Sequence, residues 1–457
     1  MPSDFELFAS ITVFLCVVLW AIWYAWQIKR SHFTEPIYQF LFFYCLFVLP
    51  LPLRASVTRQ PEGDVTDHLP LLLPYMPWAV ILCSIGLPLF IWAYYSQLSN
   101  RLGLRLPRPA EGRNSRTAFV CLALVSIFLL TLLARDAGNL IDFILLGYGS
   151  SAETFGRGYL AVGFPWLWVA SFFLLYRYSL HKTRTDLLLF FIACMSNLLI
   201  NFLMGNRGLI VYFAIAVWLF WHHAIRPIST RKLALLGIAA FLSLNLVGIV
   251  RGSKFESVSN FWQRTTDAFD RSRESNDALF YTLTIGEFVV PFETLPQMIR
   301  SVGSSLSPQL GATYLRAPSF WIPGALYPSR PLPLSNWYMK EFYGSGLGLN
   351  ENRSFFFLSE GYLNFGTVGV LATMIGWGLF LGACRSYERH NRGNPGAVLI
   401  YAFTVAFIFR GVAGEFVSIF VGLPEQILSA VIVGLWITNR KRRIIQPSPL
   451  RQLGKAV

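Results

Sequence analysis

Eleven long apolar runs dominate the chain and limit what it can fold into. A membrane-spanning helix needs about 20 apolar residues, because each residue adds about 1.5 Å across a hydrocarbon core of about 30 Å. Only 14% of the residues are charged, whereas soluble proteins carry about a quarter. We therefore expect an all-α polytopic membrane protein that forms a single membrane domain over residues 1–457. The expected spans are 5–28, 36–53, 74–98, 117–134, 158–180, 186–204, 208–225, 233–250, 362–384, 396–411 and 416–437.

The first and last runs need separate consideration. The first is too long for a secretory signal peptide and lacks a following cleavage site of small residues, so we expect it to remain as a span. The last contains Pro424 and Glu425. This leaves open a span that starts near Pro424, with residues 413–423 half embedded at the external surface.

The basic residues predict the orientation. When alternate loops are taken as cytoplasmic, starting with "QIKRSHFTE", that side holds 22 of the 38 Lys and Arg residues and 4 of the 24 Asp and Glu residues. Because basic residues accumulate in cytoplasmic loops, the N-terminus is expected outside and the C-terminus inside. The net charge of +14 then requires only membrane lipids with anionic headgroups as partners, and no nucleic acid.

This orientation places one large loop, residues 251–360 between spans 8 and 9, on the external side. Its segment "SFWIPGALYPSRP" is expected to lie in the membrane interface, with Trp321 and Tyr327 as anchors. Five prolines between positions 318 and 333 exclude one continuous helix there. Further aromatic residues of the loop could stack on sugar rings, although interface anchoring or packing within the loop explains most of them.

Six arginines on the external side lie beside apolar or aromatic stretches. A guanidinium group binds phosphate oxygens through two parallel hydrogen bonds and keeps its charge at any physiological pH. Several such groups at one depth indicate a site for a strong anion, such as a lipid-linked diphosphate. For any single arginine, an ion pair with an external carboxylate or a contact with lipid headgroups is the commoner explanation. The six are Arg207, Arg251, Arg316, Arg330, Arg353 and Arg410.

Arg207 lies on a tight bend in "NFLMGNRGLIVYF", between two expected spans. Gly205 and Gly208 permit the bend, and the free N–H groups at the start of the next helix favour an anion. The alternative is an ordinary hairpin, capped by whichever polar residues fit.

Glu360, in "FLSEGYLNFG", is the candidate catalytic residue. It precedes a span and could accept the proton of an attacking hydroxyl group, a role worth about 10²- to 10⁴-fold in rate. An ion pair with Arg353 or another arginine is the alternative. The segment "PEGDVTDH" contains the one external histidine, His68, and is more typical of a solvated loop than of a metal site. We expect no metal and no cofactor, because arginines can neutralise a leaving diphosphate.

Three motifs resemble those of a known family. "MGNRGLIVYF" resembles a Gly-x-Arg turn between two spans, and "FWIPGALYPSRPLPL" resembles an aromatic–proline segment followed by Pro-x-Arg-Pro. "SEGYLNFGTVGVL" resembles a Glu-x-Tyr-x-Asn-Phe-Gly sequence at the start of a late span. Over about residues 186–425, the chain thus resembles the Wzy-type oligosaccharide repeat-unit polymerases, which include O-antigen and enterobacterial common antigen polymerases.

The resemblance implies a GT-C-like fold in the bacterial inner membrane and a metal-independent glycosyltransferase active on the periplasmic face. It would transfer a growing glycan from undecaprenyl diphosphate to the non-reducing end of a second lipid-linked repeat unit. A chain-length regulator and a flippase of the same pathway would be partners. The motifs assign site roles to Arg207, Arg330 and Glu360. Position and charge alone support the other members of the set, Arg251, Arg316, Arg353 and Arg410.

Three alternatives remain open. An O-antigen ligase is the nearest, but ligases are thought to use a histidine in an external loop, and residues 251–360 contain none. A lipid-linked-oligosaccharide flippase or other transporter would place ionisable groups near the midplane of several spans, whereas these spans carry few charges. A noncatalytic scaffold within a polysaccharide assembly complex is the third.

Overall fold

The computed structural model describes most of the chain, and the secondary structure of the described ranges is helical. Within them, the one extended pairing is an isolated bridge between Val302 and Leu306. The described residues are 4–57, 69–110, 112, 114–137, 140–145, 158–204, 206–229, 232, 286–322, 326–344 and 353–439.

Ten helical segments in these ranges are long and apolar enough to cross a membrane, and each coincides with an expected span. The eighth expected span, 233–250, lies outside the described residues. In hydrocarbon every backbone N–H and C=O group must be paired within the protein, which explains why these runs are helical. The expectation of a polytopic all-α membrane protein is confirmed at this level. The main helices are α1 (Asp4–Trp23), α2 (Pro36–Val48), α5 (Met76–Tyr94), α7 (Ser115–Leu133), α11 (Gly163–His181), α12 (Arg184–Leu203), α13 (Arg207–Phe220), α20 (Phe357–His390), α21 (Pro395–Ala406) and α24 (Ser429–Asn439).

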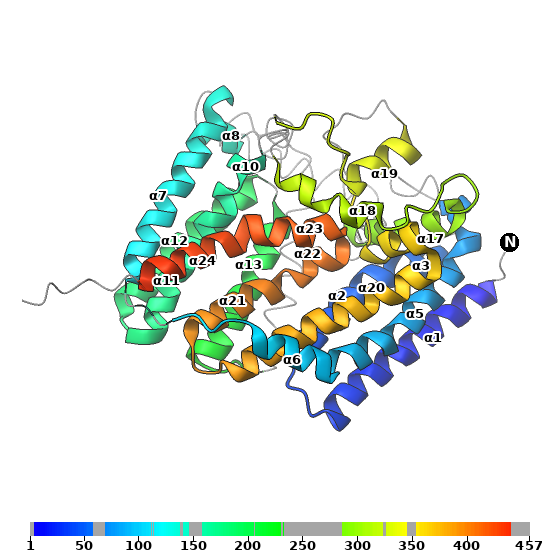
Figure 1. Cartoon of the computed structure of the whole chain (residues 1–457), viewed down its shortest axis with the longest axis horizontal. Helices are drawn as coiled ribbons and strands as arrows, with labels where there is room; N and C mark the ends of the chain where they lie inside the picture. The colour runs from blue at the N-terminus through cyan, green and yellow to red at the C-terminus, as the bar shows by residue number, and fades with distance from the viewer. Residues whose placement is uncertain are drawn as a thin grey trace, which may run out of the picture.

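The helices form two groups that meet along a seam (Figure 1). In the first group, α20 packs on α5 and on the short α6 (Gln97–Arg105), and α5 packs on α1. Gly378 and Gly382 allow the close approach, since a Cβ atom at either position would lie 2.4 Å from a backbone oxygen of α5. In the second group, α11 packs on α7 and α12, α24 on α7, and α13 on α21. The seam is formed where α20 meets α21 and where α2 meets α22 (Ile408–Ala413).

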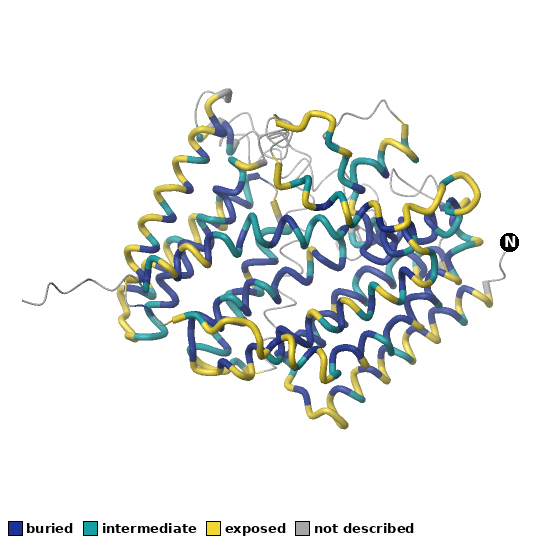
Figure 2. The backbone as a smooth tube through the Cα atoms, in the orientation of Figure 1, coloured by how far each residue is buried: buried dark blue, intermediate teal, exposed yellow. Residues whose placement is uncertain are grey.

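Burial separates central helices from peripheral ones (Figure 2). In the spans that contain α11 and α21, 78% of the apolar window is buried, but only 28% is buried in α7 and α12. The exposed apolar side chains of α7 and α12 therefore suit contact with lipid rather than with protein.

Short helices cover one end of the bundle, which we call the loop face. They are α17 (Val290–Ser301), α18 (Ala312–Leu315) and α19 (Leu334–Tyr343), and Figure 1 shows them on one side of the long helices. The other end, which we call the opposite face, carries α6 and the link from α20 to α21 (Figure 1).

Two spans are irregular near the loop face. At about 1.5 Å per residue, the 34 residues of α20 exceed a hydrocarbon core of about 30 Å. Its helix is interrupted at Phe365 and Gly366, where Gly366 has φ 58° and ψ −142°. The last span, Phe416–Asn439, is irregular but not broken: α23 (Phe416–Phe420) is followed by the turn residue Val421 and then by the π-helix η8 (Pro424–Leu428). Glu360 and Asn364 lie just before the interruption of α20, and Glu425 and Gln426 lie in η8.

Candidate active site

Glu360 lies in the first turn of α20 and is 1% exposed. Its Oε1 accepts a hydrogen bond from the hydroxyl group of Thr313 at 2.7 Å, and its Oε2 accepts one from the backbone N–H of Phe416 at 2.5 Å. One turn later, Asn364 donates to the Thr313 hydroxyl oxygen at 2.7 Å and accepts from the N–H of Gly311 at 2.9 Å. The carboxylate therefore connects α20 to α18 and α23, and both of its oxygens are engaged. Its role as a catalytic base stays a prediction.

Glu415 is a second buried carboxylate beside the first. Its Oε2 accepts from the N–H of Leu334 at 2.6 Å and its Oε1 from the hydroxyl group of Ser335 at 3.4 Å, which fixes the start of α19. Burial raises the pKa of Glu415, and the N–H groups of Leu334 and Ser335 and the charge of Arg316 oppose that rise. From the sequence, Glu415 is an external acid and a weaker candidate base than Glu360; its loop partners lie about 80 positions earlier and could not be predicted.

Arg316 follows α18 and acts electrostatically on both Glu360 and Glu415. Among the described residues, no carboxylate oxygen lies within the 4.0 Å of an ion pair with it. Its charge therefore partly offsets two carboxylates without being tied to either.

Arg353 is the exception among the arginines of the loop face. Its Nη2 lies 3.3 Å from Oε2 of Glu293, which is buried in α17, and its guanidinium group lies 4.4 Å from the centre of the Tyr343 ring. The hydroxyl groups of Tyr338, at 3.2 Å, and of Tyr343 donate to the same carboxylate. The ion pair that the sequence suggested between Arg353 and Glu360 is thus formed with Glu293 instead.

Arg330 and Arg410 both lie near η8. Nη1 of Arg330 donates to the carbonyl oxygens of Phe320 at 3.3 Å and Ile322 at 3.1 Å, and its charge acts on Glu425 in η8. Arg410 is exposed at the end of α22, and its Nη1 donates to Oε1 of Gln426 in η8 at 2.9 Å. Within the described ranges, neither guanidinium group has a carboxylate oxygen at ion-pair distance.

The backbone of Arg207 begins α13, four residues after the end of α12 at Leu203, so the bend is as short as expected. A Cβ atom at Gly208 would lie 3.9 Å from Cε1 of Phe409. The start of α13 is therefore next to Arg410. The side chain of Arg207, the whole of Arg251 and the segment around His68 lie outside the described part of the structure.

A row of aromatic rings lines α23. Ring centres are 5.2 Å apart between Tyr314 and Phe416, 5.3 Å between Phe416 and Phe420, and 5.0 Å between Phe420 and Trp321. The sequence indicated Trp321 as an interface anchor but did not single out the two phenylalanines, which lie either in the last expected span or in the half-embedded segment 413–423. Their spacing of four residues, which places both on one helix face, was the signal available.

This end of the molecule thus combines buried carboxylates that fasten the loop with cationic groups that have no carboxylate partner in the described part of the chain. Such an arrangement is suited to binding an anion. Among the described residues, no group of three His, Cys, Asp or Glu side chains is placed to hold a metal ion. The chain matches no family model, no curated protein and no solved structure, so the chemistry of the site must be argued from its geometry.

Proposed function

We propose that the protein is a polysaccharide polymerase of the bacterial inner membrane with its loop face in the periplasm. It would transfer a growing glycan from undecaprenyl diphosphate to the non-reducing end of a lipid-linked repeat unit. The observation that carries this proposal is that Arg330 and Arg410 both lie near η8, at the end of an apolar helix bundle, with no carboxylate partner among the described residues. The diphosphate of a membrane-bound carrier would lie at that depth.

The chemistry needs a charge stabiliser and a proton acceptor. The acceptor hydroxyl group attacks the anomeric carbon of the donor, a new C–O bond forms, and the C–O bond to the diphosphate breaks. Undecaprenyl diphosphate leaves with the bonding electrons, and fixed guanidinium groups stabilise the charge that develops on it. The hydroxyl proton passes to a base. Glu360 would have to exchange its bond to Thr313 or to Phe416 for one to the sugar hydroxyl group.

Arginine replacement tests the proposal. We expect Arg330→Ala, Arg410→Ala and Arg207→Ala each to abolish long chains, while the protein still inserts into the membrane. Lysine at the same positions should restore them only in part, because an ammonium group lacks the planar fork of guanidinium. The measurement is a gel of surface polysaccharide from a strain that lacks its own polymerase and carries each variant.

Lys340→Ala is the matched control, because it removes an exposed cation from α19 at the same face. It should leave the ladder of chain lengths unchanged. Normal ladders from Arg330→Ala and Arg410→Ala at wild-type protein levels would remove the diphosphate site.

Transport of the same lipid-linked glycan is a second candidate, favoured by the interruption of α20 and by the π-helix in the last span, both beside ionisable side chains. Purified protein in detergent, where no compartments exist, distinguishes the two. Polymer formed there from lipid-linked repeat units supports the polymerase.

For a ligase, gene deletion would leave full-length chains on the carrier, whereas a missing polymerase would leave single repeat units.

A further inference from the structure

We propose that the opposite face binds an anionic phospholipid, whose phosphate group is held by Arg389 and Arg392 at the end of α20. This site lies at the other end of the bundle from Glu360 and does not depend on the function proposed above.

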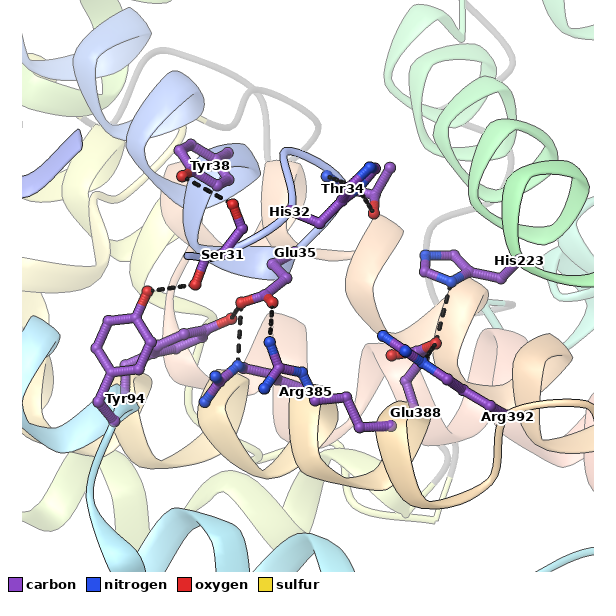
Figure 3. A network of polar contacts seen from close by, with 12 residues as sticks. Ser31, His32, Thr34, Glu35, Tyr38, Tyr94, His223, Arg385, Glu388 and Arg392 are labelled. Carbon is purple, nitrogen blue, oxygen red and sulfur yellow. Dashed lines mark hydrogen bonds and ion pairs between the residues drawn. The ribbon is translucent and has the colours of Figure 1, made fainter. Parts of the chain in front are cut away.

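Glu35 organises the first half of this site (Figure 3). It lies in the link before α2 and is 8% exposed. Its Oε2 lies 3.0 Å from Nε of Arg385 and accepts a hydrogen bond from Tyr94 at 3.4 Å, and its Oε1 is paired with Nη2 of Arg389. The side chain of Arg385 is only 10% exposed, whereas that of Arg389 is 40% exposed. The buried arginine thus already neutralises Glu35.

Glu388 organises the second half. Its Oε1 lies 3.1 Å from Nδ1 of His223, which comes from η5 (Trp221–Ile225) in the second helix group, and 3.3 Å from Nε of Arg392 (Figure 3). The Arg392 side chain is 67% exposed. Both terminal nitrogens of Arg392, and Nε and Nη1 of Arg389, have no partner among the described residues. Each exposed arginine therefore contacts its carboxylate through one nitrogen, which orients the guanidinium group. Among the described residues, its other two nitrogens remain available to a ligand.

The net charge of this site and its depth in the membrane indicate the class of ligand. Among the described residues of this site, three arginines contact the two carboxylates and Lys29 shares the Tyr95 ring with Arg385, so two positive charges exceed the two negative ones. Lys29 and Arg385 both lie over the ring of Tyr95, at 5.4 and 4.9 Å, just after the span Leu69–Tyr94. Aromatic rings at span ends mark the headgroup level of a membrane. A lipid phosphate lies there, and guanidinium groups bind phosphate oxygens more strongly than neutral donors do.

The test compares two pairs of arginines at the same face. Arg389→Gln with Arg392→Gln removes two charges but leaves Arg385 on Glu35 and His223 on Glu388. Arg101→Gln with Arg105→Gln removes two exposed charges from α6 and is the control. Each full-length protein is melted in nanodiscs of phosphatidylcholine with and without phosphatidylglycerol, and bound phosphatidylglycerol is counted by native mass spectrometry.

Wild type and control should melt higher when phosphatidylglycerol is present. The Arg389/Arg392 variant should lose more than half of that shift and its bound lipid, while its melting temperature in phosphatidylcholine is kept. An equal loss in the control, a full shift in the variant, or an equal fall of its melting temperature in both membranes would each overturn the site. If the double variant does not fold, Arg392→Gln alone must show the same selective loss.

Discussion

Arg353 and Arg330 belong to the same loop and carry the same charge, but the structure gives them different surroundings. Arg353 is paired with Glu293, and two tyrosine hydroxyl groups donate to the same carboxylate. Arg330 donates to backbone carbonyl groups and has no carboxylate at ion-pair distance within the described ranges. Removing a partner from a buried ion pair costs about 3–5 kcal/mol, because a buried charge is left uncompensated.

We therefore expect Arg353→Ala to lower the free energy of unfolding by roughly this amount, and Arg330→Ala to lower it far less. Thermal unfolding of the detergent-purified variants measures the difference. The double variant Arg353→Met with Glu293→Gln should be more stable than Arg353→Ala, since it removes both charges together. Equal melting temperatures for Arg353→Ala and wild type would contradict a structural role for the ion pair.

At this scale, the sequence could supply the type of residue but not its partner. Motifs distinguished Arg207 and Arg330 from the other four external arginines, but charge and position gave no way to tell which of the six is neutralised. Which of them is neutralised depends on contacts between positions far apart, such as Arg353 with Glu293 across 60 residues. Glu415 was ranked below Glu360 for the same reason, because nothing near it in the chain indicates that it accepts the N–H of Leu334.

Among the helices, α20 is the most distinctive element, because it is interrupted at Phe365 and Gly366. Gly366 has a positive φ of 58°, which L-residues rarely adopt, and a Cβ atom there would meet nothing within 4 Å. The cost in stability of placing a side chain at position 366 would therefore come from backbone strain, of about 1–3 kcal/mol. Gly376 lies in the same helix, also with open space around it, but with no such φ.

We expect Gly366→Ala to destabilise the protein by about 1–3 kcal/mol and to reduce polymer formation, because the turn that carries Glu360 would be redirected. Gly376→Ala should be neutral or stabilising by up to about 1 kcal/mol, as alanine favours a helix over glycine. Melting temperature and the polysaccharide gel report both effects. Indistinguishable variants would show that the interruption does not depend on glycine.

The spans themselves were predictable, because hydrocarbon leaves an apolar segment of this length little choice other than a helix. The interruptions were not. "NFG" in α20 has the same hydropathy whether the helix continues or breaks, and the break accompanies bonds from Asn364 to Thr313 and Gly311 in a distant loop. In the last span, the π-helix η8 begins at Pro424, where proline leaves a local signal, but the helical segment as a whole runs from Phe416 to Asn439.

Orientation is a property of the whole molecule, and it can be measured directly. We expect a cysteine at Ser305, on the loop face, to react with a membrane-impermeant thiol reagent added from the periplasmic side. A cysteine at Gln97, at the start of α6, should react only after the inner membrane is opened. Both positions are exposed. Cys16 and Cys121 are also exposed, so the background must be free of native cysteines. The reverse pattern would invert the topology and move the proposed polymerase site to the cytoplasm.

A single helix, α20, makes polar contacts at both ends of the molecule. Glu360, near the start of α20, fastens the loop, and Glu388, near its end, joins His223 and Arg392 on the far surface. A change in the lipids of one leaflet would thus act on α20, the same helix that positions Glu360 in the other leaflet. Gly366 interrupts this helix. The conformational freedom of its backbone would therefore determine how far a displacement of α20 on one side of the bilayer changes the position of Glu360 on the other.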